Sequence, residues 1–260
     1  MTASNTLLEA RNIVLRYGDD APAILENFNL SMARNEIISI LGASGVGKSS
    51  LLRVLAGLQI PNGGRILVHG KELRHVDPRF AVAFQNPGLL PWLTLEKNVA
   101  FGLNFKNQPK LPKVERQARV SKAIHEVGLD YARKLRPFEL SGGMAQRAGL
   151  ARCFARKPEV LFLDEPFGAL DELTRQDMQN LLIKLVDEFQ ASGILVTHDI
   201  DEALLVSDRI ILLGGAPANI IGTWNIDFPK PRNRFVEELG AIRIEILAAL
   251  RDATIKRDKK

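Results

Sequence analysis

The chain has 260 residues, of which 46% are hydrophobic and 25% charged, a composition typical of a soluble globular protein with one large domain or two closely joined ones. No apolar run approaches the roughly 18 residues that a membrane span needs, and the first residues lack the pattern of a secretion signal. The single cysteine, Cys153, excludes an internal disulfide and is expected to be a small core residue in a reducing compartment. The net charge of +5 is compatible with an anionic partner, but no basic stripe interleaved with aromatic residues favours nucleic acid.

The first part of the chain shows strand-like alternation in two segments, 7–18 and 23–32, which predicts an antiparallel layer. Further runs are rich in β-branched residues and apolar at nearly every position, which predicts strands buried on both faces, as in a parallel sheet. These runs cover residues 37–41, 65–69, 81–85, 160–164, 193–197 and 209–213.

Helical patterns alternate with these runs, which indicates an α/β fold. From about residue 94 to 157 helical segments follow one another between breakers such as NQPKLP and RPFELSGG, which predicts a helical subdomain inserted into the α/β core. Two later segments, 171–190 and 232–252, each have one apolar stripe at helical spacing, and Gly193 is expected to stop the first. The stripes are Met178, Leu181, Leu182, Leu185 and Phe189 in the first, and Phe235, Leu239, Ile242, Ile246 and Leu250 in the second.

The stretch GASGVGKSS follows an apolar strand and precedes a helical pattern. It matches the phosphate-binding pattern G-x-x-x-x-G-K-[ST], in which glycines let successive N–H groups point at phosphate oxygens and the helix adds its positive N-terminal end. Lys48 can neutralise the β- and γ-phosphates, and Ser49 can offer its hydroxyl to Mg²⁺. The predicted nucleotide-binding residues are Gly42, Ala43, Ser44, Gly45, Val46, Gly47, Lys48, Ser49 and Ser50.

Three other predicted strands end in polar residues suited to phosphate or metal. Asp164 ends the run 160–164 and Glu165 follows at once; an aspartate there can orient Mg²⁺, and the next carboxylate can polarise a water. His198 and Gln85 follow two further strands, and either alone would mean little. Because carboxyl ends of parallel strands face one crevice, the set together predicts a phosphoryl-transfer site.

The motifs in order along the chain are the P-loop, FQ, LSGGMAQR, VLFLDEP, GALD and VTHD. Their order and spacing resemble the ATP-binding-cassette (ABC) ATPases over essentially residues 7–225. The resemblance implies an α/β fold with a P-loop NTPase core, an N-terminal antiparallel β layer and an inserted α-helical subdomain at about 90–157. We expect an ATPase domain over residues 1–225, followed by a C-terminal amphipathic helix and basic tail at 226–260.

The resemblance implies an ATP hydrolase with ATP and Mg²⁺ as cofactors, and it assigns roles by position. Glu165 would be the base that activates water, together with His198 at the γ-phosphate and Lys48 in the P-loop. Gln85 would touch Mg²⁺ or the water, and Asp164 and Ser49 would complete the metal site. Tyr17 occupies the position where an aromatic ring stacks on adenine in this family, although it could equally be an ordinary strand aromatic.

The small residues of LSGGMAQR are explained by a second subunit. In the family two cassettes face each other head to tail, so Ser141, Gly142 and Gly143 of one copy would contact the γ-phosphate held by the other. Asp171 would cross the same interface. Ser141 can also be a plain helix N-cap at the same time. Ala145 departs from the polar or basic residue of many relatives, which is expected to alter packing rather than activity.

A single cassette without a membrane span resembles the separate ATPase subunit of a multi-subunit transporter. The stretch LLPW places Leu89, Leu90 and Trp92 where the family has its groove for the coupling helix of a membrane subunit, with Trp92 as a helical-subdomain core residue as the alternative. The motifs LLPW, EPFGALDELTR and PKPRNRF resemble importer ATPases of the nitrate, sulfonate and taurine group.

The expected partners are a second copy of the chain, integral membrane permease subunits and, indirectly, a periplasmic or extracellular solute-binding protein, with no nucleic acid. The expected location is peripheral, on the cytoplasmic face of the cell (inner) membrane. Alternatives are an ABC ATPase of another importer group, a regulatory or repair ATPase, and a P-loop kinase. The transported solute would contact other subunits, so this chain cannot specify it.

Overall fold

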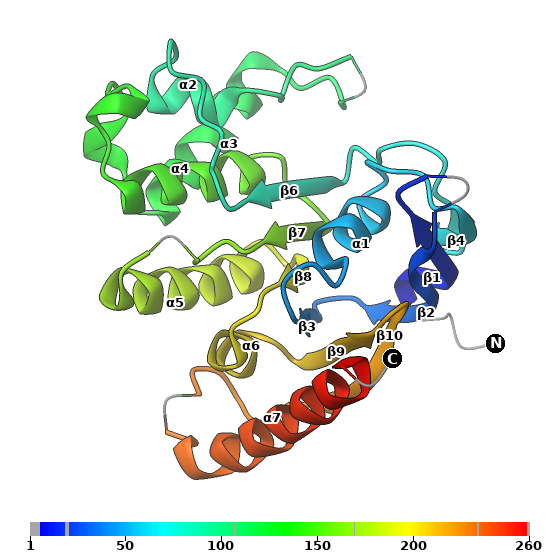
Figure 1. Cartoon of the computed structure of the whole chain (residues 1–260). Coiled ribbons are helices and arrows are strands. Elements are labelled where there is room, and N and C mark those ends of the chain that lie inside the picture. The colour runs from blue at the N-terminus through cyan, green and yellow to red at the C-terminus, as the bar shows by residue number, and fades with distance from the viewer. Residues whose placement is uncertain (1–5, 19–20, 107, 169, 233, 259–260) are drawn as a thin grey trace, which may run out of the picture. The chain divides into compact units, whose positions relative to one another are not determined.

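The structure, a computed structural model, describes residues 6–18, 21–106, 108–168, 170–232 and 234–258, with side chains as far as residue 253 (Figure 1). The chain forms two compact units. The first comprises residues 1–77 and 192–260, and the second comprises residues 78–191.

The first unit contains an antiparallel layer built on β1 (Thr6–Arg16) and β2 (Ala23–Ala33), as the alternation predicts. β4 (Gly63–Val68) pairs with the other edge of β1, and the two-residue β5 (Lys71–Glu72) pairs with β4, both antiparallel. The prediction that the run 65–69 is a strand of the parallel sheet is therefore wrong. Ile66, Leu67 and Val68 are buried although β4 belongs to the antiparallel layer, and a short apolar run alone does not reveal the direction of its neighbouring strand.

The parallel part of the first unit is centred on β3 (Ile37–Gly42), all six residues of which are buried. It lies between β8 (Ser192–Val196) and β9 (Arg209–Gly215), parallel to both. β10 (Ala218–Asn225) runs antiparallel to β9 and pairs with β2 through Ala218 and Leu25, so it joins the two layers. Burial on both faces explains why β3 and β8 read as continuous apolar runs.

Three helices belong to the first unit: α1 (Lys48–Leu55), α6 (Ile200–Val206) and α7 (Val236–Asp258). α7 lies against β9, β10 and α6 (Figure 1). Its predicted apolar stripe is confirmed, because Leu239 and Ile246 are buried in a cluster with residues of α6 and β9, and Phe235, Ile242 and Leu250 pack against that cluster.

The second unit pairs β6 (Phe80–Phe84) in parallel with β7 (Val160–Asp164), as the apolar runs predict. Between these strands lie α2 (Leu95–Ala100), α3 (Lys113–Glu126) and α4 (Gly142–Phe154), with two short 3₁₀ turns at Asp130–Ala132 and Pro137–Glu139. The helical pattern predicted between about 94 and 157 is therefore confirmed.

The last helix of the second unit, α5 (Glu172–Glu188), buries Met178, Leu182 and Leu185 of its predicted stripe. The predicted stop signal at Gly193 is wrong, because Gly193 lies inside β8. The left-handed residue after α5 is instead Gln190, with φ 50°. A single non-glycine residue can take this conformation where a helix ends, at a modest cost.

One buried arginine connects α6 to the segment that leads into α7. Arg232 is 2% exposed, and its guanidinium donates to the carbonyls of Leu204, Ile226 and Phe228 at 2.8–2.9 Å and also to that of Ser207. Burial lowers the pKa of Arg232, while the carboxylate of Asp208, 3.7 Å away, opposes that shift. A fixed fork of five N–H donors suits such a set of carbonyls, which a lysine could not satisfy at once.

Asp208 extends this connection to the strand that carries the phosphate loop. Its Oδ2 accepts from the N–H of Ile37 at 2.8 Å, and its Oδ1 pairs with Lys230 at 2.8 Å. The backbone N–H of Asp208 donates to the carbonyl of Ile37 at 2.7 Å. The first residue of β3 is therefore tied to the segment before α7 through one carboxylate.

We expect Arg232→Met to lower the free energy of unfolding by about 3–5 kcal/mol, because buried carbonyls and Asp208 lose their donors together. Arg251→Met, an exposed position on α7, is the matched control and should change it by less than about 0.5 kcal/mol. Urea unfolding followed by circular dichroism measures both. Equal stability of the two variants would contradict this role of Arg232.

Candidate functional site

The P-loop leaves β3 at Gly42 and ends where α1 begins at Lys48. Gly47 has φ 100°, in the left-handed region, and a Cβ there would lie 2.9 Å from Cγ2 of Ile24. Both the conformation and the space therefore require glycine at this position. The curl aims the first N–H groups of α1, which lack intrahelical partners, toward the loop, as an anion site requires.

Lys48 is 5% exposed, and its ammonium group is folded back over the loop. Its Nζ donates to the carbonyls of Gly42 at 2.8 Å and Ala43 at 3.1 Å. These contacts hold a positive charge inside the loop, where it can meet an incoming phosphate. Ala43, Ser44 and Gly45 are exposed, so the loop is open to a ligand.

His198 lies at the same edge of the first unit's sheet as the P-loop. β8 runs parallel to β3, and the N–H of Thr197 donates to the carbonyl of Ile40 at 3.3 Å. Thr197 in turn donates its hydroxyl to buried Glu202 of α6 at 2.7 Å, which anchors the end of the strand. The His198 side chain is exposed beyond this anchor.

Tyr17 follows β1, and its side chain is 78% exposed. The alternative of an ordinary strand aromatic is wrong, because β1 ends at Arg16 and Tyr17 lies outside the strand. The ring is available on the hairpin whose second strand supplies Ile24 against the P-loop. An exposed aromatic face is suited to stacking on a nucleobase.

The second unit brings Gln85, Asp164 and Glu165 together. Phe84 and Asp164 are register partners, so Gln85 and Glu165 follow neighbouring parallel strands. A Cβ added at Gly168 would lie 3.3 Å from Nε2 of Gln85 and 3.8 Å from Oε2 of Glu165, which places both side chains around this glycine. The predicted juxtaposition of Gln85 with Glu165 is thus present, and Asp164 ends the neighbouring strand.

Glu165 has φ 46°, a left-handed conformation that is uncommon for a residue with a long side chain. The sharp turn redirects the chain directly after β7, so Asp164 and Glu165 need not follow the alternation of a regular strand. Both are half-buried. Local strain of this kind is found at functional sites, where the surrounding structure holds it.

The two glycines at the start of α4, Gly142 and Gly143, have different surroundings. A Cβ at Gly143 would lie 3.0 Å from Cγ2 of Thr174 on α5, so packing within the unit favours glycine there. A Cβ at Gly142 would meet nothing within 4 Å, and Gly142 is exposed. Packing inside the described chain therefore gives no reason for glycine at position 142.

Two predicted interface residues are helix N-caps. Ser141 is exposed and its hydroxyl accepts from the N–H of Met144 at 3.3 Å, which confirms the N-cap alternative. Asp171 accepts from the N–H of Thr174 at 3.1 Å and from its hydroxyl at 2.7 Å, and the hydroxyl bond is the largest cause that lowers the pKa of Asp171. Both caps leave the side chains at the surface.

Sequence reasoning missed the contacts by which α4 holds the segments that follow Glu165 and Gln85. Gln146 is buried and donates to the carbonyl of Pro166, next to Glu165, at 2.7 Å. Arg152 donates to the carbonyls of Gly88 at 2.9 Å and Pro87. The polar residue in LSGGMAQR and the arginine two turns later were the only signals, and neither indicates a partner without the fold.

The residues of LLPW lie between Gln85 and α2. Trp92 is 69% exposed, so the alternative that it belongs to the core of the helical subdomain is wrong. Leu89 and Leu90 are half-buried, and Asn98 of α2 holds this segment by exchanging bonds with the backbone of Leu90 at 2.7 and 3.2 Å. A large exposed aromatic beside half-buried leucines is typical of a contact surface.

Cys153 is buried in α4, and burial raises the pKa of its thiol to about 11. The side chain is therefore a protonated thiol at neutral pH, which confirms the prediction of a core residue.

These features define a P-loop nucleotide-binding protein: parallel strands, a loop whose backbone requires glycine, and a buried lysine at the start of the following helix. Residues 25–168 match the family model of the ABC transporter. The chain is 46% identical over 230 residues to the aliphatic sulfonates import ATP-binding protein SsuB 1 of Xanthomonas axonopodis pv. citri, covering 87% of this chain and 90% of the relative. It is 46% identical to the nitrate import ATP-binding protein NrtC of Synechocystis over 211 residues, which are 81% of this chain but only 31% of that relative.

A solved structure is also similar, at 29% sequence identity with a TM-score of 0.72, covering 86% of this chain and 100% of the other. It is the dimeric, post-hydrolysis structure of the ATP-binding cassette MJ0796 bound to ADP and Pi. The chain therefore belongs to the ABC transporter family, as an ATP-hydrolysing cassette. This confirms the predicted resemblance, the fold class and the enzyme class. No helix in the described parts of the chain combines the length and apolarity of a membrane span.

We expect Gln146→Met to lower the free energy of unfolding by about 1–2 kcal/mol, because the carbonyl of Pro166 loses a buried donor. ATP turnover should fall as well, because Pro166 directly follows Glu165. Gln176→Met on the exposed face of α5 is the control and should change neither quantity. Urea unfolding and phosphate release measure the two effects, and unchanged turnover would show that this bond does not position Glu165.

Proposed function

We propose that this chain is the ATPase subunit of an importer for small anions and that it works as a head-to-tail pair beneath two membrane subunits. The observation that carries the proposal is the P-loop, in which Gly47 requires glycine and buried Lys48 presents its ammonium group to the loop. Names of relatives that import sulfonates and nitrate support the class of solute. The molecule transported contacts other subunits, so its identity lies outside this chain.

ATP would bind with its phosphates on the nine residues from Gly42 to Ser50 and with adenine on Tyr17. The exposed loop and the exposed ring supply phosphate donors and a stacking face. Lys48 would exchange its carbonyl partners for phosphate oxygens, which a flexible ammonium group can do with little rearrangement.

The residues present fit Mg²⁺. The candidate ligands Ser49, Gln85 and Asp164 are all oxygen donors, and among the described residues no group of three or more His, Cys, Asp or Glu could hold a metal alone. Mg²⁺ typically takes one or two protein carboxylates and completes its shell with water and substrate phosphates. When bound, the ion would neutralise charge that develops on the phosphates.

Hydrolysis would proceed by in-line attack of water on the γ-phosphorus, with cleavage of its bond to the oxygen that bridges to the β-phosphate. Glu165 would take the proton of the attacking water, and ADP and inorganic phosphate would leave. His198 would donate to the γ-phosphate and Gln85 would orient the water. The strained turn at Glu165 supports a functional position for its carboxylate.

The second copy would complete the nucleotide cage with Ser141, Gly142 and Gly143, and Asp171 would contact the partner at the same interface. The open space beside Gly142 supports this pairing, because no described residue of the same chain lies within 4 Å of where its Cβ would stand. The dimeric relative supports pairing of cassettes in general. The caps made by Ser141 and Asp171 leave both side chains accessible.

The membrane subunit would dock on the surface formed by Leu89, Leu90 and Trp92. Arg152 and Gly149 of α4 hold the preceding Pro87, since a Cβ at Gly149 would approach Cβ of Pro87 to 2.9 Å. A push on the docking surface would therefore reach both Gln85 and the helix that begins at Gly142. The subunit would then lie peripherally on the cytoplasmic face of the membrane, with a solute-binding protein on the opposite side.

We expect Glu165→Gln to bind ATP but to lower turnover at least about 100-fold, because the amide cannot accept the proton of the water. The variant should accumulate as an ATP-bound dimer, which size-exclusion chromatography measures. Glu237→Gln on the exposed face of α7 is the matched control and should keep normal turnover. Normal turnover in Glu165→Gln would exclude this carboxylate as the base.

We expect Gly142→Ala to leave the thermal midpoint unchanged or slightly raised, because its Cβ meets nothing and alanine favours helices. ATP turnover should nevertheless fall about tenfold, since the methyl group would crowd a nucleotide held by the partner. Gly240→Ala in α7 also meets nothing within 4 Å and is the control, with unchanged turnover. Full activity of Gly142→Ala would count against the contact across the dimer.

A further inference from the structure

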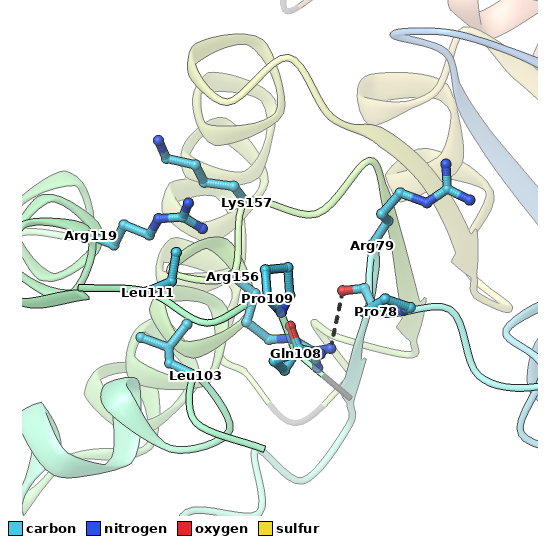
Figure 2. A pocket seen from close by; sticks show the side chains of 9 residues that line it. All are labelled: Pro78, Arg79, Leu103, Gln108, Pro109, Leu111, Arg119, Arg156 and Lys157. Atoms are coloured by element: carbon cyan, nitrogen blue, oxygen red, sulfur yellow. Dashed lines mark hydrogen bonds between the residues drawn. The ribbon is translucent and has the colours of Figure 1, made fainter. Parts of the chain in front are cut away.

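The second unit contains a cavity of about 200 Å³ that none of the predicted nucleotide residues lines. It lies between the residues before β6, the segment after α2 and the C-terminal end of α4 (Figure 2). Its walls are largely apolar and include Leu103, which is 3% exposed, together with Leu111 and Pro109. The space corresponds to about seven water molecules at roughly 30 Å³ each.

Four cationic side chains line this cavity, and two of them are neutralised. Arg119 of α3 pairs with Glu115 at 2.6 Å, and Arg79 pairs with Glu159 at 3.7 Å. In Figure 2 the guanidinium of Arg79 extends away from the other labelled side chains. The remaining two are Arg156 and Lys157, and no carboxylate in the described parts of the chain forms an ion pair with either.

Arg156 is half-buried without adequate acceptors. Its Nε is inaccessible to solvent and has no hydrogen-bond partner among the described residues. Its Nη2 donates a single long bond of 3.4 Å to the carbonyl of Pro78, drawn as a dashed line in Figure 2. Burial lowers the pKa of the guanidinium, so the surroundings disfavour its charge. An anion in the cavity would relieve this unfavourable burial.

Lys157 stands beside Arg156 at the end of α4 in a left-handed conformation with φ 52°. Glycine or asparagine would adopt this conformation at lower cost. Cations at a helix C-terminus also stabilise its dipole, by about 0.3–1 kcal/mol. That effect accounts for two cations at this end of α4, but it does not account for a cavity with apolar walls beside them.

We propose that this cavity is a binding site for a small organic anion, a short aliphatic chain that ends in a sulfonate or carboxylate. The headgroup would pair with Arg156. The exposed side chain of Lys157, which points away from Arg156 in Figure 2, would turn inward to join it, and the aliphatic chain would contact Leu103 and Leu111. A bare inorganic ion would lose hydration against apolar walls without replacement, and a neutral apolar molecule would leave the two cations unpaired. The site is separate from the proposed ATPase chemistry and does not rest on it.

The test is isothermal titration of the full-length chain with butane-1-sulfonate in the absence of nucleotide. We expect one molecule bound per chain and about tenfold weaker binding in Arg156→Gln, which loses a charge-assisted contact. Lys157→Gln should weaken binding severalfold. Because Lys157 is exposed, this variant tests the site even if Arg156→Gln fails to fold. Lys134→Gln, an exposed cation that does not line the cavity, is the matched control and should bind normally.

Two further probes separate the parts of the ligand, because sodium sulfate lacks the chain and butan-1-ol lacks the charge. Both should bind at least tenfold more weakly than butane-1-sulfonate. Lys48→Gln should retain full binding of butane-1-sulfonate, which distinguishes the cavity from the anion-binding P-loop. The proposal is overturned if the wild-type chain shows no binding, if Arg156→Gln and Lys157→Gln both bind normally, if sulfate binds as tightly, or if Lys48→Gln loses the binding.

Discussion

The backbone between β3 and α1 is the constraint on which the first unit depends. Gly42 and Gly47 each have a neighbouring atom within 2.9 Å of where a Cβ would stand, so the loop closes around the space that side chains would otherwise fill. Only this tight curl allows Lys48 to be both the first residue of α1 and a buried cation bonded to the loop's own carbonyls. The phosphate-binding geometry is therefore a property of the backbone, and the side chains add charge to it.

In the second unit, α4 is the element on which the positions of the other site segments depend. It begins at Gly142, and along its length Gln146 holds the residue after Glu165 while Arg152 holds the segment after Gln85. A rigid helix whose side chains contact both segments can transmit a displacement between them without a change of fold. Such coupling through packed elements and hydrogen bonds is what a transport ATPase needs between its docking surface and its chemistry.

Buried Arg232 and half-buried Arg156 show how the available acceptors separate a structural role from a binding role. Burial lowers the pKa of both Arg232 and Arg156. Arg232 is compensated by four carbonyls and the carboxylate of Asp208, so its charge stabilises the joint between α6 and α7. Arg156 has one long bond to Pro78 and an open cavity beside it. The difference lies in the hydrogen-bond acceptors that the fold supplies. The sequence cannot show it, because both residues are arginine.

The strands, most of the helices and the P-loop could be predicted from the sequence, because these follow from local periodicity and from the conformational freedom of glycine. The sequence also shows which polar residues end apolar runs, since Asp164 ends the run 160–164 and Gln85 ends the run 81–85. Direction and partnership of strands were decided by tertiary structure: the run at 65–69 looks like a buried parallel strand but pairs antiparallel with β1. Three other features likewise depend on residues distant in the chain. They are the exposure of Trp92, the open space at Gly142 and the uncompensated charge of Arg156. A pattern records what a residue tends to do locally, whereas a side chain's neighbours and its access to solvent exist only once the chain has folded.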